Sequence, residues 1–325
     1  MTPLERALHD RIRAEGPITV EAYMAACNAY YYATRDPLGA AGDFTTAPEV
    51  SQMFGELVGA ALADCWKRAG EPDKAIYVEL GPGRGTLAAD ALRVLRQGGF
   101  AGGVHLVETS PVLQETQRQS VGDAIWHETT DGLPAGPALI VANEFLDALP
   151  IRQHVGGIER RVAIVGGHLT FDRDGEIVET APARAEAVDA LARHLVANGG
   201  AALLIDYGHG TSAPGDTLQA VRGHRHAPVL ESPGEQDLTA HVDFAAVARS
   251  ANAAGASVTE LTSQGRWLRA LGIEARARAL SEGNRGRGGE VDAALHRLIG
   301  VDEMGELFKV IAIHSPAWPR PMGFA

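Results

Sequence analysis

The sequence is poor in cysteine, in long apolar runs and in positive charge. Two cysteines, Cys27 and Cys65, occur in 325 residues, too few for a disulfide framework or a cysteine-rich metal site. No apolar run approaches the roughly 18 residues of a membrane span, and the N-terminal residues lack the apolar core of a signal peptide. The net charge of −12 argues against a broad nucleic-acid-binding surface. We therefore expect a soluble cytoplasmic protein that does not insert into membranes.

Short apolar runs alternate with amphipathic stretches from residue 75 onward. β-Branched runs of this length are typical of buried strands, and a period of 3.6 residues is typical of helices. Their alternation predicts an α/β protein with a mainly parallel, doubly wound Rossmann-like sheet. The predicted strands are 75–80, 104–107, 124–127, 138–142, 201–205, 257–261 and 307–313, and the predicted helices are 86–97, 110–120, 183–197, 243–254, 264–271, 273–281 and 290–299.

Three segments depart from this alternation, and we expect each to form a separate unit. Residues 1–70 predict an N-terminal helical extension. Residues 151–182 hold short strand-like runs separated by glycine pairs, which predict a β-meander insertion. Residues 263–304 predict a small helical cluster, and 209–240 are expected to be irregular. The Rossmann-like core then comprises 71–150, 183–262 and 305–318.

A glycine loop follows the first predicted strand. Gly81, Gly83 and Gly85 allow a tight turn and a close approach of the backbone to a ligand. The helix that follows directs free N–H groups at that ligand, which favours a carboxylate or a phosphate. A dinucleotide fingerprint requires G-x-G-x-x-G, but Thr86 stands at the third glycine position. With Glu79 at the strand end, the spacing resembles the first motif of S-adenosylmethionine (SAM) methyltransferases.

Two carboxylates at strand ends match the other groups of SAM. Ligands of parallel sheets bind beyond the carboxyl ends of the strands. Glu108 follows the second strand and can accept two hydrogen bonds from a ribose diol. Glu79 is placed to hold the ammonium group, while Gly81, Gly83 and Gly85 take the carboxylate end. These five residues, together with Asn143, are the predicted cofactor-binding residues.

The acceptor of the methyl group should lie at the end of the fourth strand. Methyl transfer needs alignment and a group that accepts or orients a proton, not a metal. Glu144 and Asp147 lie three residues apart, beside Asn143 and Phe145. Two carboxylates can hold a guanidinium through paired hydrogen bonds, which favours an arginine or another cationic nitrogen as acceptor. We assign Asn143, Glu144 and Asp147 as catalytic residues and predict no metal site.

The predicted substrate-binding residues come from three places. A polar and aromatic loop precedes a helix whose start has capping-box spacing, from Thr46 to Glu49. This loop predicts a wall of the substrate site. Asp206 and Tyr207 end the fifth strand, and Phe145 ends the fourth. The predicted substrate-binding residues are Tyr32, Phe44, Thr45, Phe145, Asp206 and Tyr207.

Seven motifs together resemble the MidA-like SAM-dependent methyltransferases, and the resemblance covers nearly the whole chain. The motifs span residues 44–49, 79–87, 105–111, 142–150, 205–208, 215–220 and 237–244. Leu146 stands where members of the family usually carry a second aromatic residue. Mitochondrial members are protein-arginine methyltransferases that assist assembly of respiratory complex I. The resemblance implies SAM as cofactor, S-adenosyl-L-homocysteine as product, and symmetric dimethylation of an arginine on a complex I subunit.

Other interpretations of the sequence remain open. The glycine loop could be a strand–turn–helix without a ligand. The acceptor could be a small molecule or a nucleic acid, although Asn143-Glu144-Phe145 lacks the prolines of the motif in amino-methylating nucleic-acid enzymes. A non-catalytic assembly chaperone could use the 1–70 segment and the insertion to hold a partner. The chain also lacks the closely spaced glutamate pair of better-known arginine methyltransferases, and the oligomeric state is not predicted.

Overall fold

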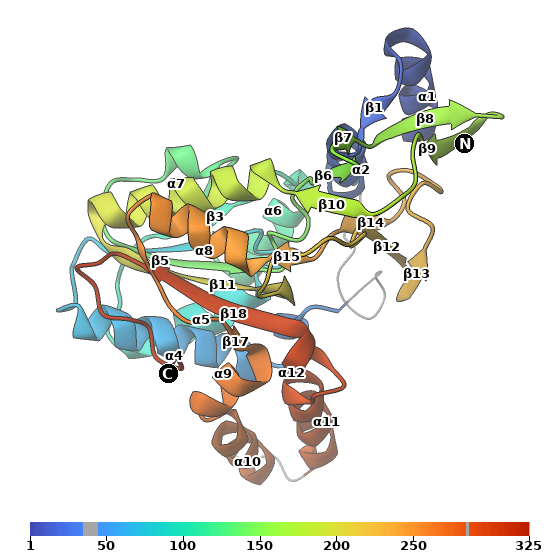
Figure 1. The fold of residues 1–325 in the computed structure, drawn as a ribbon. Helices are drawn as coiled ribbons and strands as arrows, with labels where there is room; N and C mark the ends of the chain where they lie inside the picture. Colours follow the sequence, from blue (N-terminus) through green and yellow to red (C-terminus); the bar gives the residue numbers. More distant parts are fainter. Residues whose placement is uncertain (35–44, 284–285, 325) are drawn as a thin grey trace.

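A β-sheet forms the centre of the molecule (Figure 1). The computed structural model describes residues 1–34, 45–283 and 286–324. The strand order is β16-β18-β11-β5-β2-β3-β4, in which β11 to β4 are parallel and β18 is antiparallel to β11. This arrangement confirms the predicted fold class. The bounds are β2 (Ile76–Leu80), β3 (Val104–Val107), β4 (Ile125–His127), β5 (Ala138–Asn143), β11 (Gly200–His209), β16 (Ser257–Val258) and β18 (Phe308–His314), with β15 (Val242–Asp243) beside β11 and β17 (Thr262–Ser263) beside β18.

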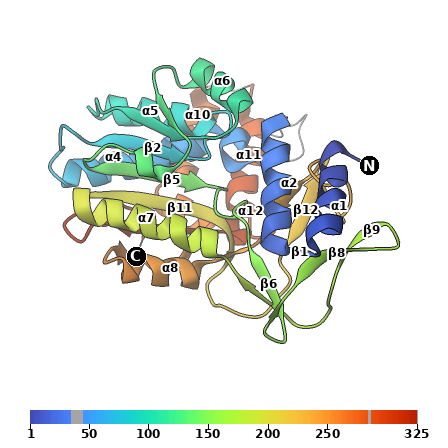
Figure 2. The same ribbon diagram turned by 90° about the horizontal axis from the view of Figure 1, so that it is seen from above.

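Helices cover both faces of this sheet (Figure 2). α4 and α5 pack on one face, where Phe54 and Leu92 share a buried cluster with Leu139. α7 and α8 pack on the other face, where Leu191 joins Ile140. β2 and β5 are therefore buried along their whole lengths, which is why their sequences are continuously apolar. The bounds are α4 (Gln52–Arg68), α5 (Thr86–Gln97), α6 (Pro111–Ser120), η1 (Thr130–Gly132), α7 (Pro182–Asn198) and α8 (Phe244–Ala253).

The start of α4 differs from the prediction. Thr46 precedes a short helix, α3 (Ala47–Val50), and its side chain makes no capping hydrogen bond. The backbone then becomes extended at Ser51, whose side chain caps α4. The predicted capping box is wrong because the Glu49 carboxylate accepts a hydrogen bond from Thr86 at the start of α5. This hydrogen bond links α3 to the start of α5, directly after the glycine loop.

The insertion forms two small sheets, and the N-terminal segment adds a strand to one of them. Ile18 of β1 pairs with Val162 of β8, so the N-terminal segment supplies a strand to the insertion. The expected single meander is instead divided into β1-β8-β9 and β10-β6-β7. The bounds are β1 (Ile18–Thr19), β6 (Arg152–Val155), β7 (Ile158–Glu159), β8 (Arg161–Val165), β9 (His168–Phe171) and β10 (Ile177–Thr180).

A third small sheet, β13-β12-β14, lies where irregular structure was expected. It forms because Leu238 and Ala220 are buried against Tyr23 of α2 in a cluster that also holds Leu8 of α1 and Ile151 of the insertion. We propose that this cluster, rather than all of residues 1–70, is the second unit of the protein, since α4 packs with the core. The bounds are α1 (Pro3–Glu15), α2 (Val20–Thr34), β12 (Gln219–Arg222), β13 (Arg225–Ala227) and β14 (Asp237–Thr239).

In the described C-terminal residues, three predicted helices appear as α9, α10 and α11, and a short fourth helix, α12, leads into β18 (Figure 1). Trp267 and Leu298 are fully buried and belong to the same hydrophobic cluster as Phe54 of α4. The bounds are α9 (Gln264–Ala270), α10 (Ile273–Gly283), α11 (Gly288–Ile299) and α12 (Met304–Leu307). Among the described residues, no helix is long and apolar enough to cross a membrane.

Candidate active site

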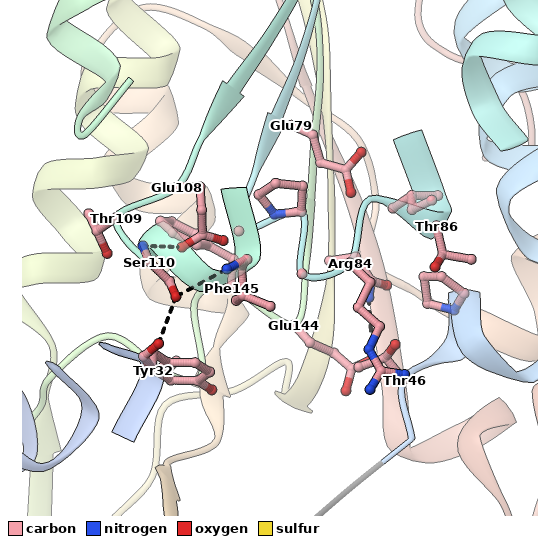
Figure 3. A pocket seen from close by; sticks show the side chains of 18 of the residues that line it. Tyr32, Thr46, Glu79, Arg84, Thr86, Glu108, Thr109, Ser110, Glu144 and Phe145 are labelled. Atoms are coloured by element: carbon pink, nitrogen blue, oxygen red, sulfur yellow. Dashed lines mark hydrogen bonds between the residues drawn. The ribbon is translucent and has the colours of Figure 1, made fainter. Parts of the chain in front are cut away.

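A cavity of about 460 Å³ lies beyond the carboxyl ends of β2, β3 and β5 (Figure 3). Parallel sheets bind their ligands at this end. Helix α2 of the N-terminal segment closes one side. Of the predicted site residues, the cavity is lined by Tyr32, Glu79, Gly81, Gly83, Glu108, Asn143, Glu144 and Phe145.

The three predicted glycines have two different roles. All three have positive φ, at 61° for Gly81, 54° for Gly83 and 79° for Gly85, a conformation that favours glycine. Gly81 and Gly83 line the cavity. Gly85 precedes α5, and a Cβ there would lie 2.6 Å from the Ser120 hydroxyl and 2.7 Å from a Val121 methyl. The third glycine therefore permits the close packing of α5 against the end of α6.

Glu79 presents a buried carboxyl to the cavity. Its side chain is 2% exposed and accepts a hydrogen bond of 2.5 Å from the Tyr77 hydroxyl. Burial raises the pKa of Glu79 to about 8. A cationic group bound nearby would stabilise the ionised form, as expected for an ammonium ligand.

Glu108 is held in place by two donors. Its Oε1 accepts from the Ser110 backbone N–H at 2.8 Å, and its Oε2 accepts from Gln117 Nε2 at 3.2 Å. Gln117 also donates to the carbonyl of Gly83 at 2.7 Å and accepts from Trp126 Nε1 at 2.7 Å. Burial raises the pKa of Glu108. Gln117 thus links the glycine loop to the carboxylate. The sequence did not identify Gln117, because a glutamine in a polar helix carries no signal.

Tyr32, in α2, forms hydrogen bonds with two other segments, one at the start of α6 and one in β14. Its backbone carbonyl accepts from Ser110 Oγ at 2.7 Å, and its hydroxyl donates to Asp237 Oδ1 at 2.8 Å. The predicted neighbour Thr45 is not among the lining residues, whereas Thr46 is. Phe44 lies outside the described residues.

The end of β5 carries the most unusual backbone in the site. Glu144 has a φ of 50°, although it is not glycine, and such strain is typical of functional sites. Its Oε1 accepts from Asn143 Nδ2 at 3.2 Å and from the Ala47 N–H at 3.3 Å. Burial, followed by the charge of Asp147, raises the pKa of Glu144 to about 8. Asn143 Oδ1 is buried and has no hydrogen-bond partner among the described residues.

Asp147, Asp206 and Tyr207 lie behind the cavity rather than on its surface. Asp147 and Asp206 are 4% and 1% exposed, and none of the three is among the lining residues. Burial raises the pKa of both carboxyls, and the charge of Asp147 raises that of Asp206 further. Asp237, whose charge also raises the pKa of Glu144, completes a buried group of four carboxyls, which we call the acidic group: Glu144, Asp147, Asp206 and Asp237.

These residues fit a ligand with the groups of SAM. The glycine loop gives a close approach, while Glu79 and Glu108 provide buried carboxyls for an ammonium and a diol. Asn143 lines the same cavity. Its buried Oδ1 has no hydrogen-bond partner among the described residues and needs a donor, since a buried acceptor without a partner is unfavourable.

Comparisons with known proteins agree with this chemistry. A family model for S-adenosyl-L-methionine-dependent methyltransferases matches residues 57–166 and 157–262. The mitochondrial protein arginine methyltransferase NDUFAF7 of Xenopus tropicalis is 34% identical, over 93% of this chain and 84% of that protein. The human protein of the same name is 33% identical, over 96% and 83%. A crystal structure from Burkholderia thailandensis with bound S-adenosyl-homocysteine has a TM-score of 0.86 and 28% identity, over 98% of this chain and 93% of that one. The chain belongs to this family of S-adenosyl-L-methionine-dependent methyltransferases.

Proposed function

We propose that the protein methylates an arginine side chain of another protein. The observation that carries this proposal is the strained Glu144 at the cavity, backed by the other three members of the acidic group. A guanidinium is the cation that carboxylates bind best through paired hydrogen bonds. The names of the relatives support the same acceptor.

The residues of the site divide between holding the cofactor and handling the acceptor. We assign Glu79, Gly81, Gly83 and Glu108 to the cofactor. SAM supplies a methyl group, whose bond to the sulfonium breaks as the bond to the acceptor nitrogen forms, leaving S-adenosyl-homocysteine. Glu144 accepts the proton that the nitrogen loses, because its pKa of about 8 lies close to the working pH of a general base. Asn143 Oδ1 accepts a hydrogen bond from the acceptor and orients it.

The finer details of the reaction follow from the family resemblance. We propose symmetric dimethylation as the product and a subunit of respiratory complex I as the first acceptor to test. Phe145 and Tyr32 line the cavity, and we assign them to the acceptor. Asp206 and Tyr207 act from behind, through the residues they contact.

The test compares cells with and without the gene by mass spectrometry of methylated peptides. Methylarginine that is lost without the gene, and restored by the wild-type gene but not by Glu144→Gln, would support the proposal. Purified protein should then transfer labelled methyl groups to the identified peptide but not to the same peptide with lysine in place of arginine. Label in RNA, or in a small molecule, with none in protein would refute it.

A further inference from the structure

The loop that carries Glu144 is held on two sides by buried groups. On one side, Asp206 Oδ2 accepts from the backbone N–H of Leu146 at 3.0 Å and of Asp147 at 3.2 Å. The other oxygen of Asp206 accepts from the Tyr207 N–H at 2.9 Å. Asp206 lies within β11, which runs on to His209 rather than ending at residue 205 as predicted, and its carboxylate binds the backbone of the neighbouring loop rather than lining the cavity.

Arg184 holds the loop from the opposite side. This arginine lies in the first turns of α7 and is 5% exposed. Its Nη2 donates to the carbonyl of Asp147 at 3.2 Å and to that of Ala240 at 2.8 Å, and its Nη1 donates to that of His241 at 2.6 Å. Asp147 is thus bound at its N–H by Asp206 and at its carbonyl by Arg184.

A strained residue persists only if its surroundings over-determine it. Glu144 itself donates its N–H to the carbonyl of Ile205 at 2.9 Å, next to Asp206. The bonds to Asp206 and Arg184 therefore oppose relaxation of the left-handed backbone of Glu144, which would turn its carboxyl away. Burying an arginine and an aspartate for this purpose is expensive, which is unusual for a purely structural turn.

We propose that Asp206 and Arg184 are positioning residues that clamp the 144–147 loop and thereby aim Glu144 at the acceptor. The part that concerns the acceptor rests on the proposed function.

The first test measures the loop and needs no acceptor. In Asp206→Ala, amide hydrogen exchange of Leu146 and Asp147 should become faster, whereas that of β2 should not change. Cofactor affinity, measured by calorimetry with S-adenosyl-homocysteine, should also stay at the wild-type value. Unchanged exchange at Leu146 and Asp147 would overturn the clamp whatever the acceptor is.

The second test measures turnover. Misplacing a catalytic group by about 1 Å lowers the rate by about 10²-fold, so Asp206→Ala and Arg184→Met should lower kcat by that order without raising the KM for SAM. Asp206→Asn should recover much of the rate, because the amide oxygen still accepts from the N–H groups of Leu146 and Asp147, although the amide nitrogen loses the bond to the Tyr207 N–H. Arg184→Lys should recover only part, because a lysine cannot reach three carbonyls. If the alanine and methionine variants fail to fold, these two conservative variants carry the test.

Two variants serve as matched controls. Arg160 is another buried arginine, 6% exposed, but it bonds Gln153 in the insertion and Asp216 in the segment before β12. Asp243 is another aspartate that accepts a backbone N–H, at the start of α8. Arg160→Lys and Asp243→Asn should keep kcat and the exchange of the loop. Equal losses of kcat in the controls, or a rise in KM for SAM that matches the loss of kcat in Asp206→Ala, would refute a positioning role. A protein whose acceptor is not arginine would fail the proposed function but still show the exchange result.

Discussion

The two ends of the cavity are built in different ways. The cofactor end comes from one stretch of chain, from Glu79 to Gln117. Both carboxylate oxygens of Glu108 there accept hydrogen bonds, from Ser110 and from Gln117. The acceptor end combines α2, β5, α7, β11 and β14, and within the described part of the chain it leaves the buried Oδ1 of Asn143 without a partner. At the first end, the binding carboxylate is therefore already held in one position. The second end keeps strain and unmet hydrogen bonds, which a bound acceptor can relieve.

The largest effect should come from the strained glutamate at the acceptor end. Glu144→Gln keeps the size of the side chain but removes the base, so kcat should fall by about 10²–10⁴-fold. Cofactor affinity should not change, because Glu144 belongs to the other end. Glu79→Gln is the counterpart and should weaken cofactor binding instead. Rates with labelled SAM measure kcat, and calorimetry with S-adenosyl-homocysteine measures cofactor affinity. A kcat close to wild type in Glu144→Gln would show that Glu144 is not the base at the acceptor end.

A smaller effect is expected from Glu108 at the cofactor end. A hydrogen bond to a charged group contributes about 1.5–3 kcal/mol, so Glu108→Ala should weaken cofactor binding by about 10- to 100-fold. At saturating SAM, kcat should recover. Glu115→Ala is the control, because Glu115 lies in the neighbouring α6 and its side chain is 67% exposed. Wild-type affinity in Glu108→Ala would show that the carboxylate does not contact the ligand.

Gly85 should affect stability more than chemistry. Alanine there meets both a positive φ and contacts below 3 Å with Ser120 and Val121. Such strain costs about 1–3 kcal/mol, which lowers Tm by a few degrees per kcal/mol. Gly122 also has positive φ, at 82°, but open space around it, so Gly122→Ala isolates the backbone part. Equal Tm values for the two variants would mean that α5 and α6 can move apart.

The smallest effect should be on stability near neutral pH. The pKa of Glu79 and of Glu144 is raised to about 8 in the folded protein, so both contribute stability that is complete below the ordinary pKa of about 4.3 and is lost as the pH rises through about 8. Between about pH 7 and 8 the Tm of the protein without cofactor should fall by a few degrees. Glu79→Gln and Glu144→Gln should each flatten this fall. A Tm that rises over this range would contradict both pKa shifts.

The sequence predicted the core well because its signals are local. The buried runs of β2 and β5 and the helix from Thr86 to Gln97 appear within one or two residues of their predicted bounds. Gly81, Gly83 and Glu108 likewise line the cavity, and their contact with SAM stays a prediction. Gly85 has the positive φ expected of a loop glycine. Its role is close packing against Ser120 and Val121 at the end of α6, which the local sequence does not show.

The buried cluster around α2 shows where prediction from local sequence patterns fails. β1 has two residues, and no periodicity can identify it as the partner of β8. Likewise, β12 and β14 form because distant residues bury Leu238 and Ala220. Glu49 had the spacing of a cap, yet a contact with Thr86 determined its role.

The sequence by itself determined the parallel sheet, the glycine loop and the carboxylates at the strand ends, because each depends on neighbouring residues. Only the tertiary structure decided which carboxylates face the cavity and which hold the loop behind it. Glu144 directly follows β5 and lines the cavity, whereas Asp206 lies within β11 and binds the backbone of Leu146 and Asp147. That choice depends on hydrogen bonds between segments about 60 residues apart, which no local pattern records.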